Sequence, residues 1–377
     1  ALPAEFSYII DERLHAQQDE DNNQYVYHEK ILDTIIDIDS ADAFIEALST
    51  LIKRLAVDHL HIVGDIYDRG PSADKIMDLL ITHHSVDIEW GNHDILWMGA
   101  ACGNEACIAN VLRNNLKYDN IEILENTYAI SLRSLTLFAE QTYPDMRPMD
   151  AALKAISVIL FKLEGQIIMR HPEYDMVDRL LLDKIDKERG AVRIGSQEYE
   201  LNDCYFPTIR TNDAYALSAE EQHVIDDLRA AFVNSHMLRK HVRFLYENGS
   251  TYMCYNGNLL FHGCIPMTED GEFASMRLDG RDYKGKEYMD YAAKVARRAF
   301  FGNFNQSDID FMWYLWCGKK SPLAGRTMKT FERTFVVDES TYDEPKNPYY
   351  RYYQQEEYCK KILHEFGLDS DISHIIN

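Results

Sequence analysis

Residues 57–94 place the strongest constraint on what this chain can fold into. Two short apolar segments, 60–63 and 86–90, flank a helical pattern over 73–83. A strand, a helix and a second strand of these lengths form a βαβ unit, in which both strands run parallel. Because ligands bind beyond the carboxyl ends of the strands in open α/β sheets, we expect the two following loops to meet at one site.

Both loops carry side chains that suit a metal-assisted phosphate site. The first loop offers the carboxylate of Asp65 and the guanidinium of Arg69, and the second loop offers Asn92, His93 and Asp94. Oxygen and imidazole groups ligate divalent cations, and a forked guanidinium binds phosphate oxygens. The pattern therefore indicates phosphoester chemistry at the end of the sheet.

The loops also match the motifs of a known family. The segments GDIYDRG (64–70) and GNHD (91–94) resemble the calcineurin-like metallophosphatases, whose lone-histidine motif is matched by His262. The longer segments DHLHIVGDIYDRGP, HSVDIEWGNHDILW, YNGNLLFHGCIP and WYLWCGKKSPLAG resemble class III fructose-1,6-bisphosphatases of Firmicutes-type bacteria over nearly the whole chain. This resemblance implies an α/β (α+β) fold, with a metallophosphatase-type β-sandwich core, flanking helices and a mostly helical insertion.

The order of the expected elements divides the chain into three parts. Residues 1–132 form the N-terminal part of the core, and 133–250 form the mostly helical insertion. Residues 251–377 form the C-terminal part of the core, with an aromatic and basic substrate region. An Asn256-Gly257 turn predicts a hairpin at the start of this last part. We also predict two short strands within 121–132.

The resemblance assigns a dinuclear metal site to the loops. It implies that Asp65 bridges two ions, and that Asn92 and His262 ligate the second ion. Manganese is the metal that the resemblance implies. Mixed oxygen and imidazole ligands by themselves would also accept magnesium, iron or zinc.

The resemblance also assigns the acid and the phosphate ligands. His93 would act as general acid, and Asp94 would hold the tautomer of its ring. Arg69 and Asn92 would bind phosphate oxygens. We expect Asp68 to orient its neighbours rather than to ligate a metal ion.

A basic cluster stands out later in this acidic chain, at Lys319, Lys320, Arg326, Lys329 and Arg333. One hypothesis is that it holds the second phosphate of a bisphosphate sugar. The alternative is a solvated face that pairs with the acidic surface.

Composition narrows the class of partner. The net charge of −23 opposes binding to nucleic acid or to anionic membranes. The seven cysteines include no C-x-x-C pair, which is typical of a reduced cytoplasmic protein, and no apolar run is long enough for a membrane helix. A homo-oligomer is compatible with the sequence.

The sequence departs from the family pattern at both ends. No Asp-x-His precedes Asp65, although the family has this motif there, and the chain stops at Asn377, before the Gly-His-Thr-Pro segment of the family. We therefore expect an interior fragment of a longer protein, which by itself would bind metal poorly.

The function that the resemblance implies is removal of the 1-phosphate of fructose 1,6-bisphosphate by metal-bound hydroxide, yielding fructose 6-phosphate in gluconeogenesis. One alternative is a phosphoprotein or dinucleoside-polyphosphate phosphatase of the same fold. Another is a non-catalytic fragment that acts as a binding module. The intact His93-Asp94 pair favours an enzyme, and the large insertion favours the sugar bisphosphate.

Overall fold

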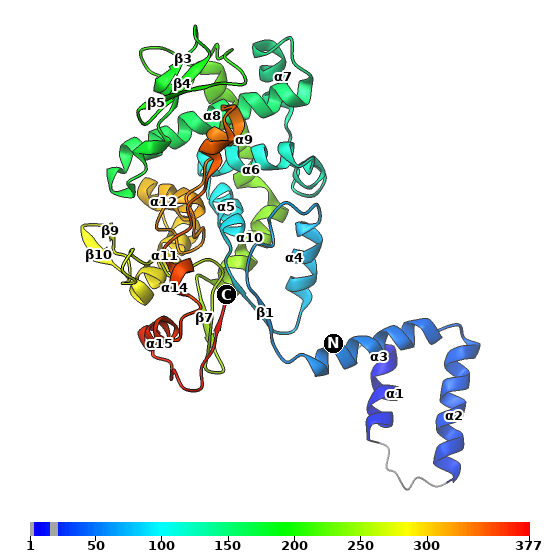
Figure 1. The fold of residues 1–377 in the computed structure, drawn as a ribbon. Helices are drawn as coiled ribbons and strands as arrows, with labels where there is room; N and C mark the ends of the chain where they lie inside the picture. Colours follow the sequence, from blue (N-terminus) through cyan, green and yellow to red (C-terminus); the bar gives the residue numbers. More distant parts are fainter. Residues whose placement is uncertain (1–3, 16–21) are drawn as a thin grey trace. The chain divides into compact units, whose positions relative to one another are not determined.

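The computed structural model describes residues 4–15 and 22–377 (Figure 1). It contains two compact units, Ala1–Leu60 with His83–Val86, and His61–Thr82 with Asp87–Asn377. Both helices and small sheets are present, so the predicted mixed α/β class is confirmed. None of the helices in the described ranges combines the length and the apolar character that crossing a bilayer requires.

The smaller unit is built from three helices, α1 (Ala4–Leu14), α2 (Asn22–Asp37) and α3 (Ala41–Ala56). Its core contains Phe6, Ile10, Ile35, Phe44 and Ala47. The rings of Phe6 and Phe44 meet edge to face, with their centroids 5.4 Å apart. Apolar side chains that recur at helical spacing thus give these helices one shared core.

The predicted βαβ unit is present. It consists of β1 (Leu60–Ile62), α4 (Ala73–Thr82) and β2 (Val86–Glu89). A third strand, β6 (Gly249–Ser250), pairs in parallel with β2, and the strand order is β1-β2-β6. The two loops of interest follow β1 and β2 at the same edge of this sheet.

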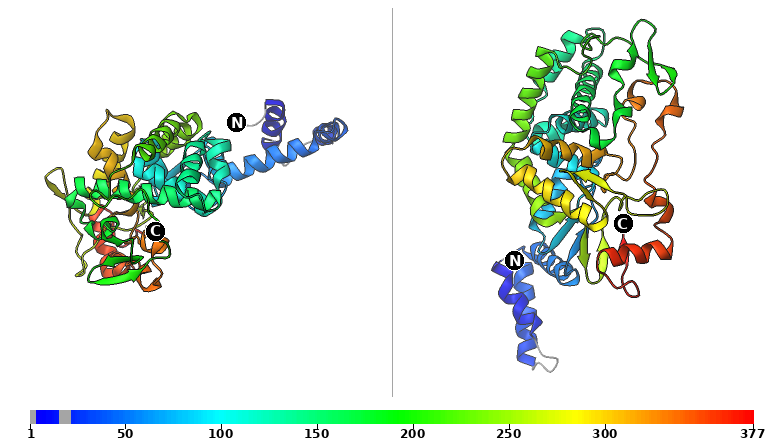
Figure 2. Two further views of the ribbon diagram at one scale, coloured as in Figure 1. Left: turned by 90° about the horizontal axis from the view of Figure 1, so that it is seen from above. Right: turned by 90° about the vertical axis from the view of Figure 1, so that its left-hand side faces the viewer.

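In the larger unit, five helices form one packed group that includes α5. They are α5 (Asn92–Ala101), α6 (Glu105–Lys117), α7 (Arg133–Thr142), α8 (Pro148–Arg170) and α12 (Gln306–Cys317). Helix α5 packs against α6 and α12, and α8 packs against α6 and α7. Figure 2 gives two further views of the helices. Helix α5 starts within the second loop, so its position fixes that loop.

The remaining elements of the larger unit are short strands, turns and helices. The β elements are β3 (Ile185–Asp186), β4 (Ala191–Ile194), β5 (Gln197–Glu200), β7 (Met253–Tyr255), β8 (Asn258–Leu260), β9 (Met276–Leu278), β10 (Arg281–Tyr283) and β11 (Ile375–Ile376). The helices are α9 (Ala219–Asn234), α10 (His236–Asn248), α11 (Gly285–Phe301), α13 (Glu332–Phe335), α14 (Tyr349–Tyr352) and α15 (Glu356–Glu365). Single 3₁₀ turns cover Pro172–Tyr174, Val177–Arg179, Leu182–Lys184 and Glu339–Tyr342.

The hairpin predicted at Asn256-Gly257 is confirmed, since β7 and β8 pair antiparallel around that turn. The parallel pairing of β11 with β8 extends it to three strands. The division of the chain into residues 1–132, 133–250 and 251–377 stays a prediction.

The two strands predicted within 121–132 are wrong. A π-helical turn, Ile123–Thr127, stands there, followed by a loop. The carbonyl of Leu124 accepts a hydrogen bond from the amide of Ile130 at 2.8 Å. Because such local bonds satisfy the backbone, these apolar residues enter the core without pairing with another strand.

A network of charged groups joins the end of α8 to α12. Asp310 accepts hydrogen bonds from Arg170 Nε at 2.9 Å, His171 Nε2 at 3.0 Å and Gln306 at 2.8 Å. The other ring nitrogen of His171 lies 2.8 Å from Glu173. Burial by itself lowers the pKa of His171, but the bonds to Asp310 and Glu173 outweigh it and raise the pKa above its ordinary value.

We predict that His171→Asn removes a pH-dependent part of the stability. With the folded-state pKa raised, the stabilisation from His171 is complete below its unfolded pKa of about 6.5 and is lost as the pH rises through the folded pKa. Urea denaturation between pH 5 and 9 should show that the native protein has the larger free energy of unfolding at low pH. The difference from the variant should shrink as the pH rises. A difference that stays constant with pH would contradict this role.

Candidate active site

The carboxylate of Asp94 joins the two loops. Its Oδ2 accepts hydrogen bonds from the amides of Asp65 at 2.8 Å and Gly91 at 2.9 Å, and its Oδ1 accepts one from Tyr67 at 3.1 Å. Burial raises the pKa of Asp94 to about 6 and the charge of Asp65 adds to the rise, while the amides of Gly91 and Tyr67 oppose it. The loops therefore meet as predicted, through a carboxylate with three backbone donors.

The backbone of the first loop takes a conformation that few residues adopt. Gly64 has φ +77°, and Asp65 follows with φ 56°, in the left-handed region that non-glycine residues rarely enter. The second loop approaches so closely that a Cβ on Gly91 would lie 2.1 Å from Asp65 Oδ1. This approach brings Asp65 Oδ1 to 3.0 Å from the amide of His93, from which it accepts a hydrogen bond.

The ring of His93 is held by Asp68. His93 Nε2 lies 3.1 Å from Asp68 Oδ1, and the ring packs edge-on against Trp316, with centroids 4.9 Å apart. Burial lowers the pKa of His93, and the charges of Asp65 and Asp68 oppose this effect. We had expected Asp94 to orient His93, but its carboxylate faces backbone amides. Asp68 contacts the ring instead, and its expected role as an orienting group rather than a metal ligand stays a prediction.

His262 reaches the site from the loop after β8. Its Nδ1 lies 2.8 Å from the carbonyl of Val63, so Nδ1 carries the proton and donates it. Its Nε2 then faces Asp65, 3.2 Å from Oδ2. Burial would lower the pKa of His262, but the bond to Asp65 raises it, and the same bond lowers the pKa of Asp65 against the effect of burial.

Asn92 and Arg69, the other two predicted site residues, lie beside Asp65, His93 and His262. The buried Asn92 side chain forms no hydrogen bond within the described ranges. The guanidinium of Arg69 lies over the ring of Tyr118, 5.1 Å from its centroid, and its Nε is 3.4 Å from Asp68 Oδ1. A cleft of about 190 Å³ is lined by Asp65, Asp68, Arg69, Asn92 and His93 among others.

These donors fit a divalent cation. Asp65, Asp68 and His93 each offer a ligand atom, and the three atoms lie within 4.8 Å of one another. The Nε2 of His262 adds an imidazole beside Asp65. Carboxylate oxygens combined with imidazole nitrogens suit manganese, iron or zinc, and oxygen donors also suit magnesium.

The five residues of the predicted basic cluster do not share one site in the structure. Three members bond elsewhere, with Lys319 Nζ 2.8 Å from Asp178, Lys320 Nζ 2.8 Å from the carbonyl of Ser275, and Lys329 Nζ 3.2 Å from Glu332. Arg326 and Arg333 line the cleft instead. Both pair with Glu344 there, at 3.8 Å and 3.2 Å.

Sequence reasoning missed one wall of the cleft. Asn110, Arg113, Asn114 and Lys117 of α6 all line it. None of these four residues is among the site residues predicted from the sequence. The signal that could have identified it was a run of polar donors at helical spacing on α6, the next helix after the one that begins in the GNHD motif.

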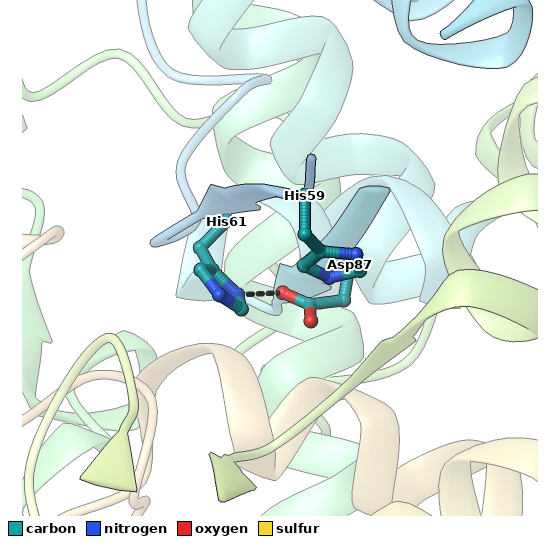
Figure 3. A group of neighbouring side chains, drawn as sticks. All are labelled: His59, His61 and Asp87. Atoms are coloured by element: carbon teal, nitrogen blue, oxygen red, sulfur yellow. Dashed lines mark hydrogen bonds and ion pairs between the residues drawn. The ribbon is translucent and has the colours of Figure 1, made fainter. Parts of the chain in front are cut away.

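A further imidazole–carboxylate pair lies on the strands that carry the loops. His61 Nδ1 of β1 is 2.7 Å from Asp87 Oδ1 of β2 (Figure 3). The ring of Tyr255 packs edge-on against His61, with centroids 4.7 Å apart. The pair therefore links the two strands a short way before their loops begin.

The whole chain matches a known family. Residues 1–377 match the model described as Firmicute fructose-1,6-bisphosphatase, and the chain belongs to that family. It is 49% identical over 401 residues to "Fructose-1,6-bisphosphatase class 3 1" of Clostridium beijerinckii, covering 100% of this chain and 60% of that relative. It is 47% identical over 402 residues to "Fructose-1,6-bisphosphatase class 3" of Listeria innocua, covering 100% of this chain and 61% of that relative.

The chain thus spans about 60% of the length of the curated relatives it matches. No solved structure matches it.

We predict that Asp94→Asn destabilises the protein. The amide nitrogen would face a backbone N–H wherever it is placed, and a buried donor without a partner costs about 1–3 kcal/mol. Urea denaturation should show a loss of that size in the free energy of unfolding. The matched control is Asp68→Asn, whose side chain is 44% exposed and holds no buried amide, so its stability should change by less than about 0.5 kcal/mol. Equal stabilities for the two variants would contradict the role of Asp94.

Proposed function

We propose that the protein to which this chain belongs, called the natural protein below, hydrolyses the 1-phosphate of fructose 1,6-bisphosphate. The products are fructose 6-phosphate and phosphate. The observation that carries this proposal is the match of all 377 residues to the Firmicute fructose-1,6-bisphosphatase family. The names of the relatives support this substrate over a phosphoprotein or a dinucleoside polyphosphate. The seven cysteines are all free thiols, which supports a cytoplasmic location.

Asp65, Asn92 and His262 are the residues that would hold manganese. The 3.2 Å separation of His262 Nε2 from Asp65 Oδ2 supports this assignment, and so does the position of Asn92 beside Asp65 in the lining of the cleft. When bound, divalent cations would neutralise phosphoryl oxygens and make the attacking water more acidic.

His93 would protonate the leaving oxygen of the sugar. Asp68 Oδ1 lies 3.1 Å from Nε2, and its negative charge favours the protonated ring inside the cleft. As a water oxygen bonds to phosphorus and the bond between phosphorus and the sugar oxygen breaks, the imidazolium form of His93 passes its Nε2 proton to the sugar oxygen. The sugar leaves with a neutral hydroxyl and His93 is left as a neutral imidazole. Packing against Trp316 limits rotation of the ring and keeps Nε2 in place.

Arg69 would bind the phosphoryl group that is transferred. Its guanidinium borders the same cleft as His93 and lies over Tyr118, which restricts the side chain before substrate arrives. A preordered guanidinium loses little conformational entropy when it forms paired hydrogen bonds to phosphate oxygens.

We predict that His93→Asn lowers kcat for phosphate release by about 10²–10⁴-fold, the usual contribution of a general acid. The KM for fructose 1,6-bisphosphate should change little, because the proton is needed only as the bond breaks. The assay measures phosphate released with Mn²⁺ present. His223→Asn on α9 is the matched control, since this exposed histidine pairs only with Asp227 on the surface, at 3.7 Å. An unchanged kcat for His93→Asn would rule out the proposed acid.

We also predict that the natural protein, once stripped of metal by a chelator, releases no phosphate until Mn²⁺ is restored. A substrate panel should then show the highest kcat/KM for fructose 1,6-bisphosphate, ahead of a phosphoserine peptide and a dinucleoside polyphosphate. Full activity without metal would contradict the metal assignment, and preference for either other substrate would contradict the proposed reaction.

A further inference from the structure

One face of α6 presents a row of hydrogen-bond donors to the cleft. Asn110, Arg113, Asn114 and Lys117 have the spacing i, i+3, i+4 and i+7, which places them on the same side of a helix. All four line the cleft that also contains His93. The row combines two amides, one guanidinium and one ammonium, so it offers donors along its whole length.

Two of these donors are buried and unsatisfied. Asn110 is 1% exposed, and its Nδ2 has no hydrogen-bond partner among the described residues. Arg113 is 6% exposed; it donates from Nη2 to Thr334 at 2.7 Å, but no described residue accepts a hydrogen bond from its Nε. A buried donor without a partner is costly, so two such donors on one wall of a cleft indicate a ligand that accepts hydrogen bonds.

The charge on this wall is also uncompensated. Neither Arg113 nor Lys117 forms an ion pair with any residue that the structure describes. Burial lowers the pKa of Lys117, and the positive charges of Arg113, Arg333 and Arg69 lower it further. Arg69 and Arg333 have acidic partners in Asp68 and Glu344. Arg113 and Lys117 are left without an ion pair among the described residues, in a chain whose net charge is −23.

The acidic side chains of the cleft contact residues other than the donors of α6. Asp68 and Asp65 contact the imidazoles of His93 and His262, respectively. Glu344 pairs with the arginines at the other side of the cleft. The donor row on α6 is thus left with excess positive charge, which matches a small anion with several acceptor oxygens.

We propose that Asn110, Arg113 and Lys117 bind the phosphate of the substrate that is not hydrolysed. The inference rests on the proposed function, because it places the reacting phosphate beside His93 and Arg69 in the same cleft. The fork of Arg113 and the ammonium of Lys117 then hold the second phosphate. This wall selects a sugar bisphosphate over a monophosphate, since only the former occupies both places.

The test is Lys117→Met, assayed in the natural protein with Mn²⁺. Lys117 is exposed, so the protein should fold normally, which a thermal melt checks. The KM for fructose 1,6-bisphosphate should rise at least about tenfold, as expected for loss of a charge-assisted hydrogen bond. The kcat/KM for p-nitrophenyl phosphate, which carries one phosphate only, should stay unchanged. Lys360→Met on the exposed surface of α15 is the matched control and should leave both substrates unaffected.

A second readout uses fructose 6-phosphate, which carries only the phosphate that is not hydrolysed. It should inhibit hydrolysis of p-nitrophenyl phosphate by the unmodified protein, and Lys117→Met should weaken this inhibition by a similar factor. Equal losses for both substrates would overturn the inference, and so would an unchanged KM for the bisphosphate.

The two proposals fail separately. If the unmodified protein hydrolyses p-nitrophenyl phosphate but not fructose 1,6-bisphosphate, the proposed function is wrong. Inhibition by fructose 6-phosphate then decides the inference, since weaker inhibition of Lys117→Met supports the donor wall and absence of inhibition of the unmodified protein overturns it.

Discussion

The site depends on the hydrogen bonds that one buried carboxylate accepts from two loops. Asp94 accepts hydrogen bonds from the backbone amides of Asp65, Tyr67 and Gly91, and without it these amides would lose this acceptor. These bonds hold Asp65 in a left-handed backbone conformation that costs free energy in isolation. In that conformation the carboxylate of Asp65 reaches both the amide of His93 and the ring of His262. The ligand and acid groups are therefore set in place by a residue that contacts neither substrate nor metal in our proposal.

The cleft beyond these loops has two sides with opposite character. The sheet edge supplies carboxylates and imidazoles, which suit cations, whereas α6 supplies amide, guanidinium and ammonium donors, which suit an anion. Helix α5 connects them, because it begins in the second loop and packs against α6. A substrate with a phosphate at each end would use both sides, and this is the basis of the proposed selectivity.

The sequence was sufficient to predict the βαβ unit and the meeting of its loops, because strand ends and motif spacing fix both. It could not reveal which acid holds His93. His93 and Asp94 are consecutive residues in the first turn of α5, so their side chains point about 100° apart. Asp94 consequently turns to the backbone, and Asp68 from the other loop contacts the ring. The apolar residues of the segment after α6 favour strands. The sequence does not show that the backbone of this segment forms local hydrogen bonds instead.

The most direct test of this account is amide hydrogen exchange at Asp65, Tyr67 and Gly91, measured by NMR on the natural protein. If the Asp94 carboxylate holds these three amides, each should exchange far more slowly than the amides of exposed loops. Slow exchange at all three would establish that the loops are locked together. Exchange as fast as that of unprotected loop amides would show that Asp94 does not organise the site.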